Sequence, residues 1–385
     1  MIAEVIKNSF QSKYNNRPLL IKSPGRINLI GEHTDYNLGF VMPAAIEKAI
    51  YFAIQENDSK HINIETFLTS PEQITFDLNG KTNEFSSFWG NYFKAILKIL
   101  RDKKYNLKGF DCVFGGDIPI GSGLSSSAAL CCGFIYAVSE LLDLGINKAE
   151  IALIAQKAEH NIGLNCGLMD QYAVLYGKKS NALFLDCKTL DHKHIPINLH
   201  GYSWVLINSN IKHNLAVDSE YNKRRESCEL VVNHLRQSNT EINSLRDVKL
   251  ADLNSIKNEI PSTDFKRANY ILEENSRVEK MKNALESGNA NKVGALLLEG
   301  HNAMSKEYEI TTKELDLLVS IGQKLKGVIG SRMMGGGFGG CTINLVKTNL
   351  VEDSITSLIS TYKEETGIDA EVYELHIGDG VHIIS

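Results

Sequence analysis

Four ionisable side chains lie within ten residues of one another in the N-terminal part of the chain: Arg26, Glu32, His33 and Asp35. Short apolar runs flank them on both sides, so we expect them to emerge from a packed strand; a solvated charged loop is the alternative. Two carboxylates and an imidazole together can donate to and accept from the hydroxyl groups of a polyhydroxylated ligand such as a sugar. A wrong epimer would leave a buried group unpaired, at a cost of about 1–3 kcal/mol.

Asp170 is the only charged side chain between His160 and Lys178. An isolated acid in such an apolar stretch either caps a local helix or takes part in chemistry. In the second interpretation it is a base close to a nucleophilic hydroxyl group. In a phosphoryl transfer with a loose transition state the proton can leave late, so the position of the acceptor can matter more than its basicity.

A glycine- and serine-rich segment, Gly121-Ser-Gly-Leu-Ser-Ser-Ser127, joins an apolar strand-like run to a helix of small residues. A glycine-rich turn that leads into a helix points unpaired backbone N–H groups at one spot, where the helix dipole favours phosphate. Ser122 stands where a Walker A loop needs lysine, and Ser126 replaces the third glycine of a dinucleotide loop. The alternative is a flexible turn before a buried helix.

Glu159 shares a helical face with the apolar residues Ile151, Ala152 and Ala155. A carboxylate on an apolar stripe is costly unless a cation or metal pairs with it. We therefore expect a Mg²⁺ ligand, with a hydroxyl group of the segment 121–127 as the natural second one, because Mg²⁺ is usually held by one or two protein groups plus phosphates and water. A residue at the edge of the stripe that reaches solvent is the alternative.

Two further segments are candidates for binding. Five glycines occupy the six positions of Gly335-Gly-Gly-Phe-Gly-Gly340, between two apolar runs. The segment forms either a tight hairpin with close backbone contacts or a second backbone surface against a nucleotide or catalytic loop. Tyr221 begins a basic run, Tyr221-Asn-Lys-Arg-Arg225, in which a solvated helix start is the better interpretation for the basic residues. Tyr221 can stack on or bond to a ligand, but the sequence alone does not single it out.

Composition narrows the class of protein. The 385 residues suggest two domains, and a net charge of -5 without a long basic block disfavours nucleic-acid and anionic-membrane partners. The seven cysteines include no Cys-x-x-Cys pair and mostly lie in apolar surroundings, which predicts reduced, buried thiols in a cytoplasmic protein. Because the first 16 residues contain no hydrophobic signal region and no apolar run reaches 18 residues, we expect neither export nor a membrane span.

Hydrophobic periodicity and turn residues predict a mixture of helices and strands in both halves of the chain, an α+β class. A change of pattern around residues 195–201 places a boundary near residue 198, and hence domains at 1–198 and 199–385. Helices are expected at 4–14, 87–104, 126–142, 148–161, 218–237, 265–286, 290–304, 312–325 and 351–366, and residues 169–176 form a short apolar segment around Asp170. Strands are expected at 19–22, 27–30, 41–54 (as two strands with a turn at Pro43), 62–66, 73–78, 110–114, 182–186, 204–208, 341–346 and 370–376, and residues 328–334 lead into the glycine motif.

Taken together, these segments resemble galactokinases, within the GHMP superfamily of small-molecule kinases. Gly25-Arg-Ile-Asn-Leu-Ile-Gly-Glu-His-Thr-Asp-Tyr-Asn37 is similar to the galactokinase signature, the most specific of the matches. Pro119-Ile-Gly-Ser-Gly-Leu-Ser-Ser-Ser-Ala128 is similar to the ATP-phosphate loop of the superfamily, and residues 335–340 are similar to its C-terminal glycine motif. Two more patterns match, Cys166-Gly-Leu-Met-Asp-Gln171 and Ser219-Glu-Tyr-Asn-Lys-Arg-Arg225, so the resemblance spans essentially the whole chain.

The resemblance implies a two-domain GHMP kinase fold, with an N-terminal domain like domain 2 of ribosomal protein S5, a ferredoxin-like C-terminal domain, and the site between them. It implies Mg²⁺- and ATP-dependent phosphorylation of the anomeric hydroxyl of α-D-galactose, with no obligatory protein partner. Arg26 is then expected to stabilise the transferring phosphoryl group and Asp170 to be the base. By the same resemblance, sugar is bound by Glu32, His33, Thr34, Asp35 and Tyr221, ATP by Gly121, Ser122, Gly123, Leu124, Ser125, Ser126 and Ser127, and Mg²⁺ by Ser127 and Glu159.

The chain departs from the pattern at one place, because the connection from Glu159 to Gly167 is one residue shorter than is common in the family, around Ile162. Alternatives to a galactose kinase are a kinase for a related sugar, N-acetylgalactosamine or arabinose, and a catalytically silent sensor of galactose and ATP. A sensor is expected to have lost its base or serine run, and both are present. Mevalonate or homoserine as substrate does not explain the Glu-His-x-Asp cluster.

Overall fold

The computed structural model describes the chain except for residues 1, 68–71, 79–87, 120, 212–215 and 385, and the side chains of residues 88 and 216–219. Ser87, where one helix was expected to begin, and the side chains of Asp218 and Ser219 fall outside this description.

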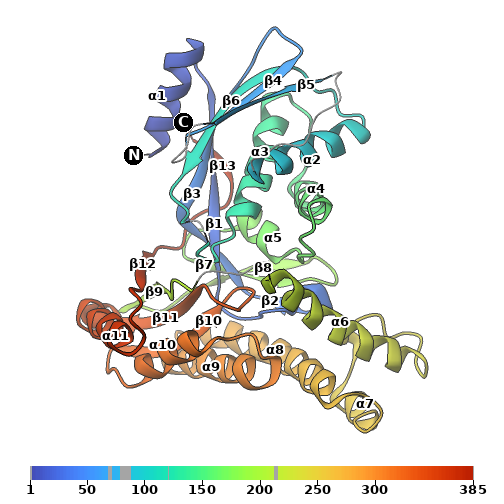
Figure 1. Ribbon diagram of the computed structural model, residues 1–385, viewed down its shortest axis with the longest axis vertical. Helices are drawn as coiled ribbons and strands as arrows, with labels where there is room; N and C mark the ends of the chain where they lie inside the picture. Colours follow the sequence, from blue (N-terminus) through green and yellow to red (C-terminus); the bar gives the residue numbers. More distant parts are fainter. Residues whose placement is uncertain (1, 68–71, 79–87, 120, 212–215, 385) are drawn as a thin grey trace.

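Figure 1 shows an upper and a lower group of elements. The helices are α1 (Ile2–Tyr14), α2 (Phe88–Asp102), α3 (Ser126–Leu141), α4 (Lys148–Asn161), α5 (Met169–Tyr176), α6 (Ala216–Arg236), α7 (Leu250–Ser255), α8 (Ser262–Glu286), α9 (Ala290–Ala303), α10 (Lys313–Gln323) and α11 (Val351–Thr366). The strands are β1 (Leu19–Asn28), β2 (Phe40–Val41), β3 (Pro43–Glu56), β4 (His61–Thr66), β5 (Glu72–Asp77), β6 (Phe110–Gly116), β7 (Asn181–Asp186), β8 (His192–Pro196), β9 (Tyr202–Asn208), β10 (Val328–Met334), β11 (Cys341–Lys347), β12 (Glu371–Leu375) and β13 (His382–Ile384).

The upper group is built on a six-stranded sheet of order β13-β1-β3-β6-β4-β5. Its strand β1, which lies between β13 and β3, corrects the prediction of two strands separated by a turn at residues 23–25. β1 pairs with β3 on both sides of that segment, and the register shifts between Pro24 and Arg26. Across this shift β1 advances by two residues, from Pro24 to Arg26, and β3 by four, from Ala49 to Ala45, so the additional residues lie in β3. An irregularity of this kind bends the strand that carries it without ending the pairing, and Arg26 follows directly after it.

The helix α3 lies on one face of this sheet beside α2, α4 and α5, whereas α1 covers the other face (Figure 1). α3 is the helix of small residues expected at 126–142, and most of its residues are buried. Gly133 is required for this close packing, because a Cβ atom there would lie 2.5 Å from the side chains of Ser23 and Phe52. Ser23 also donates a hydrogen bond of 2.7 Å to the carbonyl oxygen of Ala129, which fixes α3 against β1.

The lower group contains a four-stranded sheet of order β10-β11-β9-β12, with α9, α10 and α11 packed on its strands. A third sheet, β2-β7-β8, lies between the two groups and contacts α8. The chain then returns to the upper sheet, because β13 pairs with β1 through Leu20 and Ile384. The proposed boundary between residues 198 and 199 remains a prediction, and β13 belongs with the sheet of the first half.

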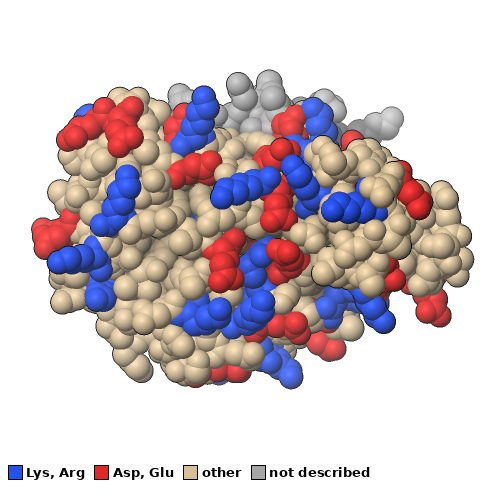
Figure 2. Space-filling model, turned by 90° about the horizontal axis from the view of Figure 1, so that it is seen from below, with Lys and Arg blue, Asp and Glu red and all other residues tan. Residues whose placement is uncertain are grey.

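The surface seen from below in Figure 2 mixes basic and acidic side chains rather than gathering one sign into a patch. Along the described residues, no helix is both long enough and apolar enough to cross a membrane. All seven cysteines are free, and all but Cys166 are buried. This agrees with the buried thiols expected from the sequence.

Candidate active site

A cavity of about 230 Å³ lies where the N-terminal signature, the loop before α5, the start of α6 and the glycine motif meet. The polar residues that line it include eight of the predicted site residues, and they come from segments far apart in the sequence. These are Arg26, Glu32, His33, Asp35, Ser127, Glu159, Asp170 and Tyr221. The glycines at 335–337 also line this cavity.

Arg26 and Asp170 form a two-pronged ion pair at the centre of this arrangement. The Nε and Nη2 atoms of Arg26 lie 2.7 and 3.0 Å from the two carboxylate oxygens of Asp170. The third nitrogen, Nη1, donates to the carbonyl oxygen of Gly123 at 2.6 Å. A guanidinium fork fixes a carboxylate in both position and orientation. Arg26 therefore ties the candidate base to the phosphate-loop candidate.

Asp170 lies in the first turn of α5 but does not occupy the N-cap position, which belongs to Leu168. Its carboxylate instead accepts hydrogen bonds from Arg26 and from the hydroxyl group of Ser125. The side chain retains 26% of its exposure, so a ligand in the cavity can reach it. Of the two interpretations open from the sequence, this geometry fits chemistry better than helix capping.

The segment 121–127 turns sharply into α3. Gly121 and Gly123 have φ angles of +74° and +71°, and Ser125 has a φ angle of +57° just before the helix begins at Ser126. Positive φ is readily adopted by glycine, and this turn leaves the first N–H groups of α3 without helical partners. Among the described residues, leaving out its chain neighbours, no atom lies within 4 Å of a Cβ atom built on Gly121, so the turn has open space beside it.

Only some of the serine hydroxyls in this segment are directed toward a ligand space. The Ser122 side chain is buried and donates to the carbonyl oxygen of Pro119 at 2.8 Å, and Leu124 is buried too. Ser125 donates to Asp170. Ser126 and Ser127 line a second, mainly apolar cavity of about 290 Å³ beside the loop. Any contact of Ser122 or Leu124 with a phosphate would therefore use the backbone.

The apolar cavity was not predicted from the sequence. Its wall includes Trp89, Tyr92, Ile118 and Leu130, and Ser127 lines both this cavity and the polar one. Trp89 belongs to α2, for which the sequence predicted a helix at 87–104 but no part in a ligand site. Its position next to the phosphate-loop candidate depends on tertiary packing, which periodicity does not specify.

Glu159 lies on α4 and is 3% exposed, so the interpretation of a residue reaching solvent is wrong. Burial raises its pKa to about 7; a hydrogen bond with Ser127 opposes this shift, and the charge of Asp170 adds to it. Gln171 also donates to the Glu159 carboxylate. The shorter connection around Ile162 therefore still brings Glu159, Ser127 and Asp170 to one cavity.

These groups suit Mg²⁺, which prefers oxygen ligands such as a carboxylate and a hydroxyl group. Ser127 at the start of α3 provides the hydroxyl group and Glu159 on α4 the carboxylate, and both line the cavity. The Glu159 carboxylate is buried, has a raised pKa and lies close to the charge of Asp170, so a dication bound there would stabilise its ionised form. Within the described part of the chain, no group of three or more His, Cys, Asp or Glu side chains is arranged to hold a metal ion.

Glu32 is 1% exposed and uses its two carboxylate oxygens differently. Oε1 pairs with Arg332 and accepts a hydrogen bond of 3.2 Å from the backbone N–H of Gly335. Oε2 is buried and has no hydrogen-bond partner among the described residues. Burial raises the pKa of Glu32, and Arg332 is the main group that opposes this shift.

His33 connects the signature to the glycine motif. Its Nε2 lies 3.1 Å from the carbonyl oxygen of Gly336, to which it must donate, so Nδ1 accepts from the hydroxyl group of Tyr36 at 2.7 Å. Tyr36 in turn bonds to Tyr308 at 2.8 Å. Burial lowers the pKa of His33 to about 4, which keeps the ring neutral. Both ring nitrogens are therefore engaged with the protein, although the residue lines the cavity.

The three remaining candidates for sugar binding differ in position. Thr34 is fully buried and donates to the carbonyl oxygens of Gly31 and Phe40 at 2.9 and 2.6 Å, so its hydroxyl group holds the loop and does not reach the cavity, contrary to expectation. Asp35 and Tyr221 both line the cavity. Burial and the neighbouring charge of Asp170 raise the pKa of Asp35 to about 6.

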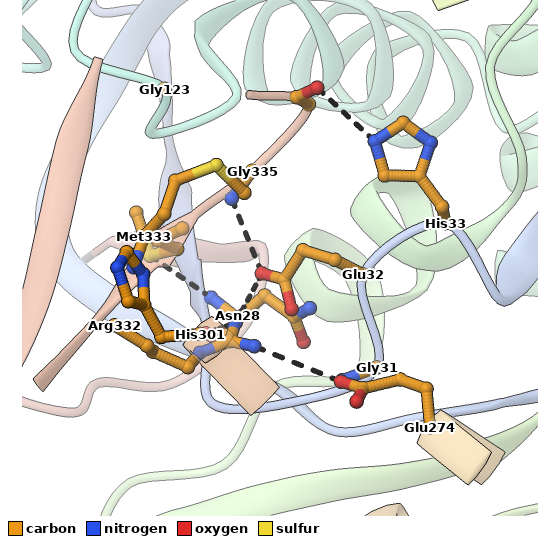
Figure 3. A network of polar contacts seen from close by, with 12 residues as sticks. Asn28, Gly31, Glu32, His33, Gly123, Glu274, His301, Arg332, Met333 and Gly335 are labelled. Atoms are coloured by element: carbon orange, nitrogen blue, oxygen red, sulfur yellow. Dashed lines mark hydrogen bonds and ion pairs between the residues drawn. The ribbon is translucent and has the colours of Figure 1, made fainter. Parts of the chain in front are cut away.

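Behind Glu32 lies a network of buried charges that sequence reasoning missed (Figure 3). Arg332 and Glu274 are both completely buried, and Arg277 adds a second guanidinium next to Glu274. A usable signal was present, because Arg332 is a lone charge in an apolar run before the glycine motif. A buried arginine is seldom without a partner, but the partner cannot be identified from such a pattern.

Comparisons with known proteins agree, along the full length of the chain, with the resemblance seen in the sequence. The family model for the galactokinase galactose-binding signature matches residues 8–56, and those for the N-terminal and C-terminal domains of GHMP kinases match residues 91–178 and 281–359. A galactokinase from Clostridium acetobutylicum is 39% identical, with 100% of this chain and 99% of that protein covered. One from Fusobacterium nucleatum is 38% identical, over 96% and 95% of the two chains.

Solved structures agree with these relatives. The structure of Lactococcus lactis galactokinase complexed with galactose has a TM-score of 0.92 at 33% identity and covers 100% of both chains. A mevalonate kinase structure has a TM-score of 0.64 at 21% identity, with coverages of 94% and 99%, which shows a common fold. The predicted two-domain GHMP kinase fold is confirmed, and the chain belongs to the galactokinase family.

Proposed function

We propose that the protein transfers the γ-phosphoryl group of Mg·ATP to the O1 hydroxyl group of α-D-galactose, giving α-D-galactose 1-phosphate and ADP. One observation carries the proposal: the Arg26 guanidinium joins Asp170, which borders the polar cavity, to the backbone of the glycine- and serine-rich turn. The candidate base and the candidate phosphate loop are thereby held next to each other, as direct in-line transfer requires.

The sugar occupies the polar cavity. Its volume of about 230 Å³ suits a small polar molecule, and the free Oε2 of Glu32 provides a buried acceptor that a sugar hydroxyl group would satisfy. Asp35 and Tyr221 supply further polar groups on the same wall. His33 and Thr34 contribute by holding the signature in place rather than by direct contact.

ATP occupies the other side of the turn. Its phosphates face the N–H groups of residues 121–127 and the N-terminus of α3, where the helix dipole favours negative charge. The adjoining apolar cavity, with Trp89 and Tyr92 in its wall, takes the nucleobase. Ser127, which borders both cavities, lies where the triphosphate crosses from one to the other.

The chemical step forms a bond between O1 of the sugar and the γ-phosphorus, and it breaks the bond between that phosphorus and the bridging oxygen of ADP. Asp170 accepts the proton that O1 loses, and no covalent intermediate with the enzyme forms. Arg26 orients Asp170 and faces the negative charge of the transferred group. Ser127 and Glu159 would hold Mg²⁺, which supplies neutralisation of phosphate charge.

The experiment that tests this function is an ATP-consumption assay with galactose, talose, N-acetylgalactosamine, arabinose and glucose. We expect galactose to be turned over with the highest kcat/KM. A mismatch at one hydroxyl group leaves a buried polar group unpaired and is expected to cost about 1–3 kcal/mol, or roughly 5- to 150-fold in kcat/KM. Equal turnover of all five sugars, or a preference for another sugar, would contradict the proposal.

Replacement of Glu159 by Gln is expected to raise the Mg²⁺ concentration required for half-maximal rate by about tenfold or more, because an amide keeps the shape but not the charge of the ligand. The measurement is a Mg²⁺ titration at saturating galactose. Glu150→Gln is the matched control, since Glu150 lies on the same helix but pairs with Lys103 away from the cavity. An identical Mg²⁺ dependence of the two variants would remove Glu159 from the metal site.

We also propose that the enzyme works in the cytoplasm with small molecules as its only obligatory partners. Its seven cysteines form no disulfide, as expected of a chain that matures in a reducing compartment.

A further inference from the structure

Arg332 is a completely buried arginine on β10 that contacts acidic groups from two other parts of the chain. Its Nη2 forms an ion pair with Oε1 of Glu32 and donates to the carbonyl oxygen of Asn28 at 3.0 Å. Its Nη1 lies 3.8 Å from Oε1 of Glu274, on α8. Figure 3 shows Arg332 reaching toward Glu32 on one side and Glu274 on the other.

The strand β10 and the residue that follows it supply two groups that act on the same oxygen of Glu32. Arg332 pairs with Oε1 from within the strand, and Gly335, three residues further on, donates its backbone N–H to that oxygen at 3.2 Å. The other oxygen, Oε2, is buried without a partner among the described residues, and Glu32 lines the polar cavity. The protein thus holds one oxygen of the carboxylate, and the other oxygen is left for a ligand to pair with.

We infer that Arg332 is a positioning residue for sugar recognition: it holds Glu32 ionised and oriented, so that Oε2 accepts a hydrogen bond from one sugar hydroxyl group. The inference rests on the sugar site proposed above. It gives Arg332, a residue of β10 outside the signature motif, a part in sugar recognition. A charged acceptor discriminates more strongly than a neutral one, because hydrogen bonds to ionised groups are roughly twice as strong.

The charges around Glu32 explain why Arg332 is needed. Glu274 faces it from α8 with the same sign of charge, and Arg277 lies behind Glu274, with its Nε 2.6 Å from Oε2 of that residue. From α8, the hydroxyl group of Tyr270 donates to the Glu32 backbone carbonyl oxygen at 3.2 Å and leaves the carboxylate untouched. Among the described side chains around Glu32, Arg332 is the cation whose charge favours the ionised form.

The sign of the pH effect follows from these contacts. Burial and Glu274 raise the pKa of Glu32, whereas Arg332 and the Gly335 N–H lower it. Removal of Arg332 leaves the two raising influences and therefore raises the pKa further. A protonated Glu32 donates through one oxygen and is a weaker acceptor, so galactose binding should then weaken at lower pH and recover as the pH rises.

The test is the KM for galactose of Arg332→Met between pH 6 and pH 9, at saturating Mg·ATP. We expect KM to rise by about tenfold at pH 7, the effect of one lost charge-assisted contact, and to fall back toward the wild-type value with increasing pH. The KM for ATP should stay within about twofold. A galactose KM equal to that of the wild type, or raised by the same factor at every pH, would overturn the inference, because a merely structural role predicts no recovery.

Glu274→Gln is the matched control, since it also removes one charge from the buried network but keeps the acceptor for the Gly31 N–H. Because Glu274 raises the pKa of Glu32, this variant should lower that pKa, the opposite of the effect expected for Arg332→Met. We expect a lower melting temperature and no rise in the galactose KM toward low pH; a profile like that of Arg332→Met would count against the inference. Should Arg332→Met fail to fold, Arg332→Lys replaces it. We expect a smaller rise in the galactose KM for this variant, and an unchanged galactose KM would overturn the inference.

Glu32→Gln distinguishes a failure of the proposed sugar site from a failure of the inference about Arg332. An unchanged galactose KM in Glu32→Gln would contradict the sugar site itself. A raised galactose KM in Glu32→Gln, together with a normal galactose KM in the Arg332 variant, would contradict only the inference.

Discussion

Replacement of Asp170 by Asn is expected to lower kcat by about 10³- to 10⁴-fold while leaving the KM for galactose within a few-fold of the wild-type value. General base catalysis typically contributes 10²–10⁴, and the amide also loses the charge that pairs with Arg26. The change keeps the size of the side chain, so the cavity should keep its shape. Steady-state kinetics with galactose as the varied substrate measure both parameters.

The chain offers a well-matched control for this variant. Asp186 is also paired with an arginine, Arg246, at 3.0 Å and is similarly half-buried, but it lies outside the polar cavity. Asp186→Asn should lose some thermal stability and keep its kcat. If Asp170→Asn retained more than a tenth of the wild-type kcat, Asp170 would act on the sugar by position alone or not at all, and the base assignment would be wrong.

Replacement of Arg26 by Lys is the second large effect, with an expected loss of about 10²- to 10³-fold in kcat. The lysine keeps the positive charge but lacks the planar fork, so it cannot hold both oxygens of Asp170 and the carbonyl oxygen of Gly123 together. Loss of one preorganised donor at a transition state commonly costs this much. Single-turnover measurements at saturating ATP and galactose isolate the chemical step.

Arg246→Lys is the parallel control, because it makes the same exchange in the ion pair with Asp186. Its single-turnover rate should match the wild type. The dissociation constants of ATP and galactose for Arg26→Lys, measured by calorimetry, should change far less than the single-turnover rate does. A rate loss below about fivefold would show that the fork geometry of Arg26 is dispensable.

The sequence alone predicted most of the helices around the site well, because each of these has a strong local signal. The bounds 148–161 coincide with α4, and apolar periodicity correctly placed Glu159 on a buried face. Residues 169–176, which form α5, were recognised only as a short apolar segment around Asp170. The error at β1 has a local cause too. Pro24 and Gly25 indicate a turn in most sequences, but here both flanking segments pair with β3, and additional residues of β3 between Ala45 and Ala49 absorb the shift in register.

What the sequence could not provide is the set of contacts between distant segments. Glu32 and His33 were expected to face the sugar, yet part of each side chain is engaged with Gly335 and Gly336, some 300 residues away. Thr34 has the residue type of a ligand contact but satisfies two nearby carbonyl oxygens instead. Arg332 carried a signal, as a lone charge among apolar residues, but which acid it would meet depends on the packing of β10 against the signature.

The pairing of β1 with β13 also constrains how the chain folds during synthesis. Leu20 leaves the ribosome early, but its partner Ile384 is made only after both the sugar signature and the glycine motif have been translated. Until then β1 presents an open edge on that side, and open edges are templates for pairing with other chains. A C-terminal fusion that hinders β13 is therefore expected to prolong this exposure.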